Sequence, residues 1–195
     1  MKEGPLDPNK NPLFSDPETI PERYWQSLKE DSYRIDFLGF RCDVLTNQRR
    51  IEVEGFPVRL DFQTYLVILH YLNSKKTDLG DEWVLARELK GGIHFFDRSH
   101  PLTVKNVLVR INGIAKLKEA FSKLKGREVN FGDYAYELEV FQGIHLRYIY
   151  YEGDEEFKPE LTVNFQKGIE NILPLDVIWA MVNVVNKVLI CFLRN

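Results

Sequence analysis

The sequence predicts a single α+β domain in which two groups of antiparallel strands pack with about five to six helices. Three observations favour this fold class. Apolar and polar residues alternate in two separate stretches, between residues 33 and 60 and between residues 134 and 165. Apolar blocks with helical spacing lie between and after these stretches. The length of 195 residues, 44% of them hydrophobic, suits one domain with a short extension.

Residues 1–21 are expected to form a proline-rich arm in front of a domain at residues 22–195. Five of the nine prolines fall in this arm, and their spacing excludes a regular helix. Good helix formers follow, with Tyr24, Trp25 and Leu28 at helical spacing. We therefore expect a short helix that packs through Trp25.

The first strand group is expected to be a small antiparallel meander. Apolar residues occupy every second position in four pairs, separated by glycine or asparagine. The pairs are Ile35 and Phe37, Cys42 and Val44, Ile51 and Val53, and Val58 and Leu60. Asp61 then provides an acidic N-cap for a largely buried helix that extends to about Ser74.

Three further helices are expected in the middle of the chain. Asp81 caps the first, which runs through Leu89 and ends at the glycine pair 91–92. The other two cover residues 101–111 and 114–125. The last helix carries a lysine-rich face, which is typical of a solvated surface.

Strands return in the last third of the chain. Residues 134–140 and 144–151 are expected to form a hairpin around the Gln142-Gly143 turn, and residues 161–165 form a third strand. The segment 173–193 is long and apolar. It also carries several strongly polar residues, which a membrane-spanning helix rarely tolerates, so it predicts a buried helix and no membrane contact.

Charge and sequence motifs exclude several functions. The net charge of -3 provides no global attraction to nucleic acid. The chain has no serine-hydrolase elbow, no P-loop and no dinucleotide-binding glycine motif, and we expect no cofactor. Cys42 and Cys191 are too few for a thiolate metal site, and they are expected to be reduced thiols. Because no apolar signal segment occurs at the N-terminus, the cytoplasm is the expected location.

An acidic loop before the third C-terminal strand is the first candidate site. Its carboxylates are Glu152, Asp154, Glu155 and Glu156. Carboxylate oxygens suit a hard cation, but the spacing lacks the alternation of a calcium loop. The alternative interpretation is a solvated turn with Phe157 in the core.

A second candidate consists of His94, Asp97 and His100, at three-residue intervals. Such residues could bind a borderline metal or act as acid and base. The preceding glycines and Pro101 favour a loop or strand here, and in a strand His94 and Asp97 would face opposite sides. A mixture of surface imidazoles and turn caps is the alternative.

The acidic segment also carries a family resemblance. Glu152-Gly153-Asp154-Glu155-Glu156-Phe157, followed by Phe165 and Ile172-Leu173-Pro174, resembles the signature of an uncharacterised prokaryotic group, the domain of unknown function family 3786. Supporting segments occur in the expected order. They are Leu69-His70-Tyr71-Leu72, Trp83 with Glu88-Leu89 and Gly91-Gly92, and Gly132-Asp133-Tyr134-Ala135-Tyr136. The resemblance covers about residues 24 to 190.

The resemblance implies an anaerobic redox or one-carbon setting, because some members carry a cysteine-rich module like that of corrinoid iron-sulfur proteins. This chain lacks those cysteines, so any cluster would belong to an iron-sulfur or corrinoid protein partner. The resemblance supplies no catalytic residue and no oligomeric state.

Two functions therefore stay open. The first is a noncatalytic binding or accessory domain, with its site in a cleft between the two strand groups. The second is a metal-assisted enzyme that uses Asp154, Glu155 or Glu156, with His145 as acid-base.

Overall fold

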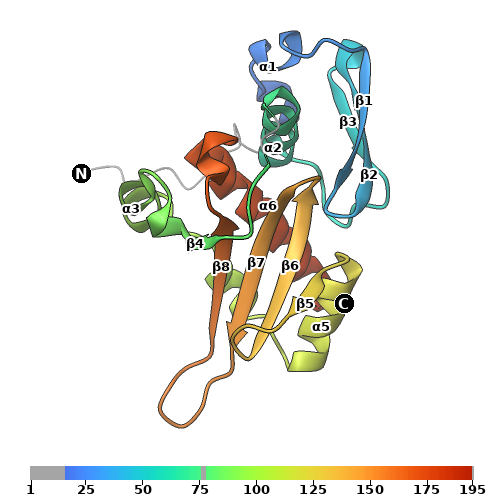
Figure 1. Ribbon diagram of the computed structural model, residues 1–195. Coiled ribbons are helices and arrows are strands. Elements are labelled where there is room, and N and C mark those ends of the chain that lie inside the picture. Colours follow the sequence, from blue (N-terminus) through green and yellow to red (C-terminus); the bar gives the residue numbers. More distant parts are fainter. Residues whose placement is uncertain (1–15, 76–77, 195) are drawn as a thin grey trace, which may run out of the picture.

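Two antiparallel sheets and six α-helices form the protein in a computed structural model that describes residues 16–75 and 78–194 (Figure 1). The predicted α+β class is confirmed. Of the predicted proline-rich arm, residues 1–15 lie outside the described residues. The next residues form one turn of 3-10 helix, Pro17–Thr19, and Ile20 is buried in the core.

The three-stranded sheet is the predicted meander. Its strands β1 (Ser32–Phe37), β2 (Phe40–Leu45) and β3 (Arg50–Val53) pair in sequence order. The fourth apolar pair, Val58 and Leu60, was wrongly expected to form a strand. These two residues lie in the connection to the next helix and pack against the core from there, directly after a proline that cannot donate to a strand ladder.

The two helices expected in the N-terminal half are confirmed. α1 (Arg23–Gln26) is short and buries Trp25. α2 (Phe62–Asn73) begins at Asp61, whose Oδ1 accepts a hydrogen bond from the N–H of Thr64 at 3.0 Å. The predicted acidic N-cap therefore satisfies one of the free amides at the start of α2.

The larger sheet has five strands in the order β4-β8-β7-β6-β5. β6 (Tyr134–Phe141) and β7 (Ile144–Tyr151) form the predicted hairpin, and β8 (Glu160–Gln166) is the predicted third strand. β5 (Arg127–Val129) pairs with β6 at one edge. The sequence did not reveal β5, because three residues are too few to show alternation.

The helix expected between Asp81 and Leu89 is wrong. Trp83–Leu85 is strand β4, which pairs with β8, and Ala86–Glu88 follows as a 3-10 turn. A short apolar run fits a helix or a strand equally well from its pattern. Here the unpaired edge of β8 decides the outcome, since pairing with it satisfies the main-chain groups of β4.

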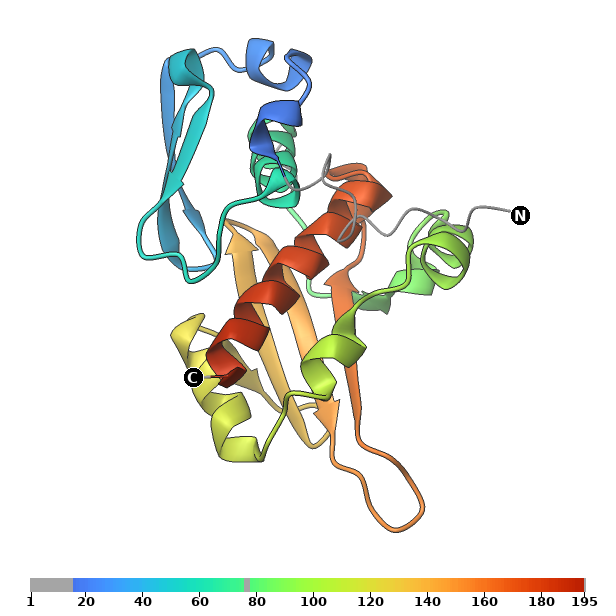
Figure 2. The same cartoon turned by 180° about the vertical axis from the view of Figure 1, so that it is seen from behind.

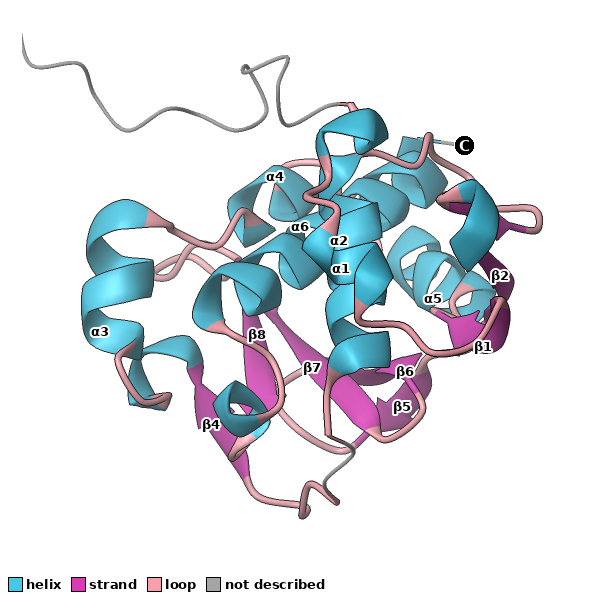
Figure 3. Ribbon diagram, turned by 90° about the horizontal axis from the view of Figure 1, so that it is seen from above, coloured by secondary structure: helices cyan, strands magenta, loops and turns pink. Residues whose placement is uncertain are grey.

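Helices cover one face of the five-stranded sheet (Figures 2 and 3). α4 (Val104–Leu108), α5 (Ile114–Lys123) and α6 (Leu175–Arg194) lie on this face, and α2 packs against α6. α4 is shorter than the predicted helix at residues 101–111, because its N-cap is Thr103. The other predicted helices are confirmed.

α6 is long and apolar enough to cross a membrane, the only such helix in the described part of the chain, and 61% of its apolar window is buried inside the protein. Its burial agrees with the sequence analysis. Lys187 Nζ of α6 lies 2.5 Å from Asp61 Oδ2 and 2.9 Å from Gln63 Oε1. This contact joins α6 to the start of α2.

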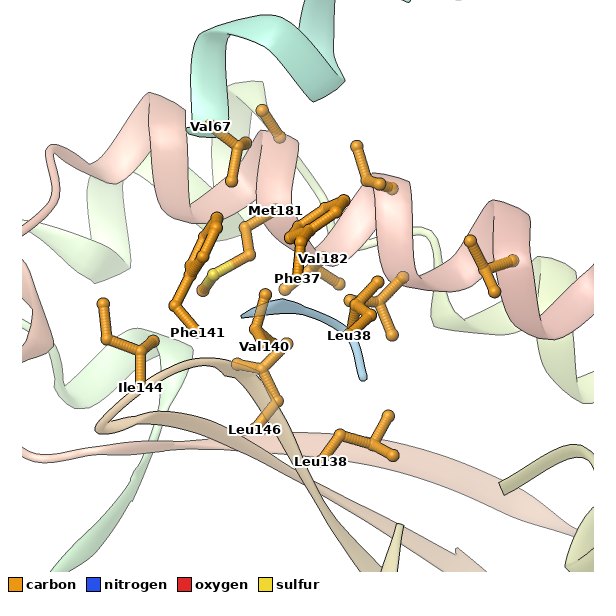
Figure 4. Packing of buried hydrophobic residues seen from close by; sticks show 14 of the residues in the cluster. Phe37, Leu38, Val67, Leu138, Val140, Phe141, Ile144, Leu146, Met181 and Val182 are labelled. Atoms are coloured by element: carbon orange, nitrogen blue, oxygen red, sulfur yellow. The ribbon is translucent and has the colours of Figure 1, made fainter. Parts of the chain in front are cut away.

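The two sheets meet at the turn between β1 and β2. Phe37 and Leu38 insert between α6 and the end of β6 (Figure 4), and both are fully buried. The N–H of Leu38 donates to the carbonyl of Val140 at 3.0 Å, and the ring of Phe37 lies 5.0 Å from that of Phe141. The turn therefore fixes how the meander is placed on the larger sheet.

Candidate functional site

The acidic loop between β7 and β8 projects from the end of the sheet (Figure 1). All four of its acidic residues are exposed. Asp154 Oδ1 accepts hydrogen bonds from the N–H groups of Phe157 at 2.7 Å and Glu156 at 2.8 Å, and these bonds hold the pKa of the Asp154 carboxyl below its usual value. The carboxylate of Asp154 thus stabilises a turn of the loop.

Phe157 is 69% exposed, so its expected place in the core is wrong. The loop extends beyond the sheet (Figure 1), and residues 152–159 are all exposed. His145 lies at the start of β7, seven residues and roughly 20 Å of strand away from Glu152, so it is not brought to the acidic loop. Within residues 16–75 and 78–194, no three histidine, cysteine, aspartate or glutamate side chains are grouped as metal ligands.

His94 and Asp97 lie on helical turns, which corrects the expected loop or strand, and His100 follows directly after the last turn. α3 (Gly92–His94) continues into a π-helical turn over Phe95–Ser99, closed by the bond from His100 N–H to Phe95 carbonyl. The ring of His100 stacks on that of Phe95, with 4.2 Å between centroids. His100 therefore packs against an aromatic ring instead of joining the other two residues around a metal.

Both cysteines are free thiols. Burial raises the pKa of Cys42 to about 12, so this thiol stays protonated at neutral pH and is a poor nucleophile. Cys191 Sγ lies 3.5 Å from the carbonyl of Pro57. The two thiols lie on different elements, β2 and α6, and do not form a disulfide.

A cleft of about 600 Å³ lies between the meander and the larger sheet. Its walls are formed by β1, by the residues that follow α5 and by the C-terminal end of β6, and α2 contributes Tyr71. The lining residues are Arg34, Ile35, Asp36, Gly39, Tyr71, Leu124, Lys125, Glu139, Phe141 and Gln142. The sequence predicts the site of a binding domain at this position, between the two strand groups.

The cleft combines a rigid aromatic base with charged walls. Tyr71 and Phe141 are buried and stacked, with ring centroids 4.1 Å apart and planes at 8°. Asp36, Lys125 and Glu139 are exposed at the walls. Such an arrangement offers apolar contact at its base and ionic contacts at its rim, as ligand sites commonly do.

The sequence profile of the family described as a domain of unknown function, DUF3786, matches residues 16–187. This chain belongs to that family. The match confirms the resemblance to domain of unknown function family 3786. No curated protein and no solved structure matches the chain.

In this DUF3786 member, Lys125 has an unusual backbone conformation beside the cleft. It follows α5 with φ 54°, in the left-handed region that favours glycine, and the N–H of Gly126 donates to the carbonyl of Phe121 at 2.8 Å to close the helix. The side chain of Lys125 lies against Gly39, where an added Cβ would come within 3.1 Å of Lys125 Cδ. Strained residues of this kind gather at functional sites.

We expect Lys125→Gly to raise the free energy of unfolding by about 1 kcal/mol, because glycine adopts the left-handed conformation at low cost. Urea-induced unfolding measures the change. Lys123→Gly, at the last residue of α5, is the control. We expect it to destabilise the protein by about 1 kcal/mol, because glycine is a poor helix former and the ion pair with Glu119 is lost. A loss of stability with Lys125→Gly would show that its side-chain contacts outweigh the backbone strain.

The sequence predicts a cleft between the two strand groups, but it does not identify the side chains of the cleft as site residues. Asp36, Tyr71 and Glu139 belong to three separate elements, and only the packing of these elements brings them together. One signal was present in the sequence. A lysine directly before the helix-ending Gly126 occupies the place where glycine is common, which marks the position as constrained.

Proposed function

We propose that this protein is a noncatalytic binding domain that holds a protein partner in the cleft between β1 and β6. The observation that carries this proposal is the cleft itself, with its volume of about 600 Å³, its stacked aromatic base and its charged rim. The side chains of the acidic loop are exposed, and in the His94 segment His100 packs on Phe95. The cleft, in contrast, is lined by side chains from four elements.

The chemistry of the cleft favours binding over catalysis. Tyr71 contributes a hydroxyl to the cleft. Burial raises the pKa of this hydroxyl, and the negative charge of Glu139 raises it further. A hydroxyl with a raised pKa transfers protons poorly at neutral pH. The lining residues include no serine, cysteine or histidine that could act as a nucleophile or as a base poised near pH 7.

The proposed class of partner is an iron-sulfur or corrinoid protein. Support for this class comes from the family resemblance, which associates the domain with cysteine-rich redox modules. The two cysteines of this chain are free and lie on different elements, β2 and α6, so a cluster would belong to the partner. The domain would then act as an accessory to a redox or one-carbon enzyme.

A photo-activated cross-linking residue at Gln142, on the rim of the cleft, tests the proposal in cells of the source organism. Asn112, which is exposed at the opposite end of α5, is the matched control position. We expect one discrete cross-linked protein from position 142 and none from position 112. That protein is expected to contain iron and sulfide or a corrinoid.

Each outcome has a definite meaning. Equal cross-linking from both positions, or none from position 142, would contradict the binding function of the cleft. A discrete partner without an iron-sulfur cluster or corrinoid would keep the binding function and reject the proposed class.

A further inference from the structure

β1 is an edge strand, because it pairs only with β2 in the three-stranded sheet. In an antiparallel pair, residues that bond to the partner strand alternate with residues whose main-chain groups point away from it. The two-residue turn puts Phe37 and Phe40 in a bonded pair, and at the other end Thr46 N–H donates to the carbonyl of Asp31 at 3.0 Å. The odd-numbered residues of β1 therefore bond to β2.

Arg34, Asp36 and Leu38 consequently direct their N–H groups to the free edge of β1. The N–H of Leu38 confirms this direction, since it donates to Val140 of β6. Outside the pairing of β1 with β2, no hydrogen bond joins the main-chain groups of Arg34 or Asp36 to another described residue. Two N–H and two C=O groups, about 7 Å apart along the strand, are thus free to bond to another chain.

This free edge faces the cleft. Three consecutive residues of β1, Arg34, Ile35 and Asp36, line the cleft. Successive side chains of a strand point to opposite faces, so three neighbours line one space when the edge of the strand faces it. The bond between Leu38 and Val140 closes one end of the cleft and leaves the rest of the edge accessible.

We propose that an extended segment of a partner protein adds to the free edge of β1 as a fourth strand, inside the cleft. This inference rests on the proposed function and specifies how the partner binds. Strand addition obtains affinity from main-chain hydrogen bonds and specificity from side-chain contacts. One face of the added strand meets the apolar base formed by Tyr71 and Phe141.

Charge defines the chemistry of the segment. Asp36 and Lys125 line the cleft without an ion pair to another described residue, whereas Arg34 is bound to Asp43 at 2.7 Å. A matching segment therefore carries a basic side chain opposite Asp36, an acidic one near Lys125, and apolar residues toward the base of the cleft. Charged side chains on β1 also discourage indiscriminate pairing with other strand edges.

Asp36→Pro is the sharpest test, because proline removes the outward N–H and leaves the bonds between β1 and β2 intact. The probe is a peptide selected on the wild-type protein from a displayed library of random 12-residue peptides, with cross-linking to position 142 as the criterion for cleft binding. We expect Asp36→Pro to raise the Kd of this peptide at least about tenfold. Asp36→Ala keeps the N–H and is the matched control, with an expected change below about fivefold.

Amide hydrogen exchange of the wild-type protein provides a second readout that does not depend on how the proline variant folds. In the free protein, the amides of Arg34 and Asp36 are expected to exchange much faster than those of Ile35 and Phe37. Bound peptide is expected to slow the exchange at Arg34 and Asp36 specifically.

Unchanged exchange at these two amides in the complex, or equal peptide binding by Asp36→Pro and the wild type, would overturn strand addition. Failure to select any cleft-binding peptide would also count against it. In each case the Gln142 cross-link in cells decides separately whether the cleft binds a partner, so the two proposals can fail independently.

Discussion

Replacing Leu38 by alanine is expected to lower the free energy of unfolding by about 3–5 kcal/mol. Leu38 is 1% exposed and lies between α6 and the end of β6, where it joins the two sheets (Figure 4). Removing its side chain leaves a cavity that the surrounding sheet and helix can fill only in part. Because the same residue positions the meander, the loss of packing also loosens the cleft.

Leu38→Gly is the matched variant that separates packing from backbone strain. Leu38 has φ 52°, which glycine adopts readily and alanine does not. We therefore expect the glycine variant to be more stable than the alanine variant by about 1 kcal/mol, the reverse of the order in a regular strand. Urea unfolding of the three proteins measures both differences. An alanine variant as stable as the wild type, or more stable than the glycine variant, would contradict this account of the turn.

The long elements could be predicted from the sequence because their patterns are local. Alternation over residues 134–151 specifies the β6–β7 hairpin, and helical spacing over residues 173–193 specifies α6. β4 could not be predicted, since the run Trp83–Leu85 becomes a strand only through pairing with β8, more than seventy residues later. Short segments take their structure from distant partners.

The candidate site shows the same limit. Residue type alone favours the acidic loop and the segment with His94 and His100, because potential ligand groups lie close together along the chain there. The cleft instead depends on a free strand edge and on the insertion of Leu38, which bring Asp36, Lys125 and Glu139 around one space. A strand edge is a property of the sheet order, which local periodicity does not contain.

Replacing Asn186 by alanine is expected to lower the free energy of unfolding by about 2–4 kcal/mol. Asn186 is 2% exposed and stands in a buried chain of hydrogen bonds. Tyr148 Oη donates to Asn186 Oδ1 at 2.8 Å, Asn186 Nδ2 donates to Thr103 Oγ1 at 3.0 Å, and that hydroxyl donates to Asn183 Oδ1 at 2.8 Å. The alanine variant leaves the buried hydroxyl of Tyr148 without its acceptor.

The double variant Tyr148→Phe with Asn186→Ala distinguishes this explanation from a simple loss of volume. Tyr148→Phe alone is expected to cost about 1–2 kcal/mol, because it leaves Asn186 Oδ1 unpaired. With both changes no unpaired group remains between these two residues, so the double variant is expected to lose about 1–2 kcal/mol less than the sum of the single losses. Asn112→Ala, at an exposed position, is the control and should change stability by less than about 0.5 kcal/mol. If the losses in the free energy of urea-induced unfolding are additive, Tyr148 and Asn186 have no interaction energy, and their hydrogen bond does not stabilise the packing of α6 on the sheet.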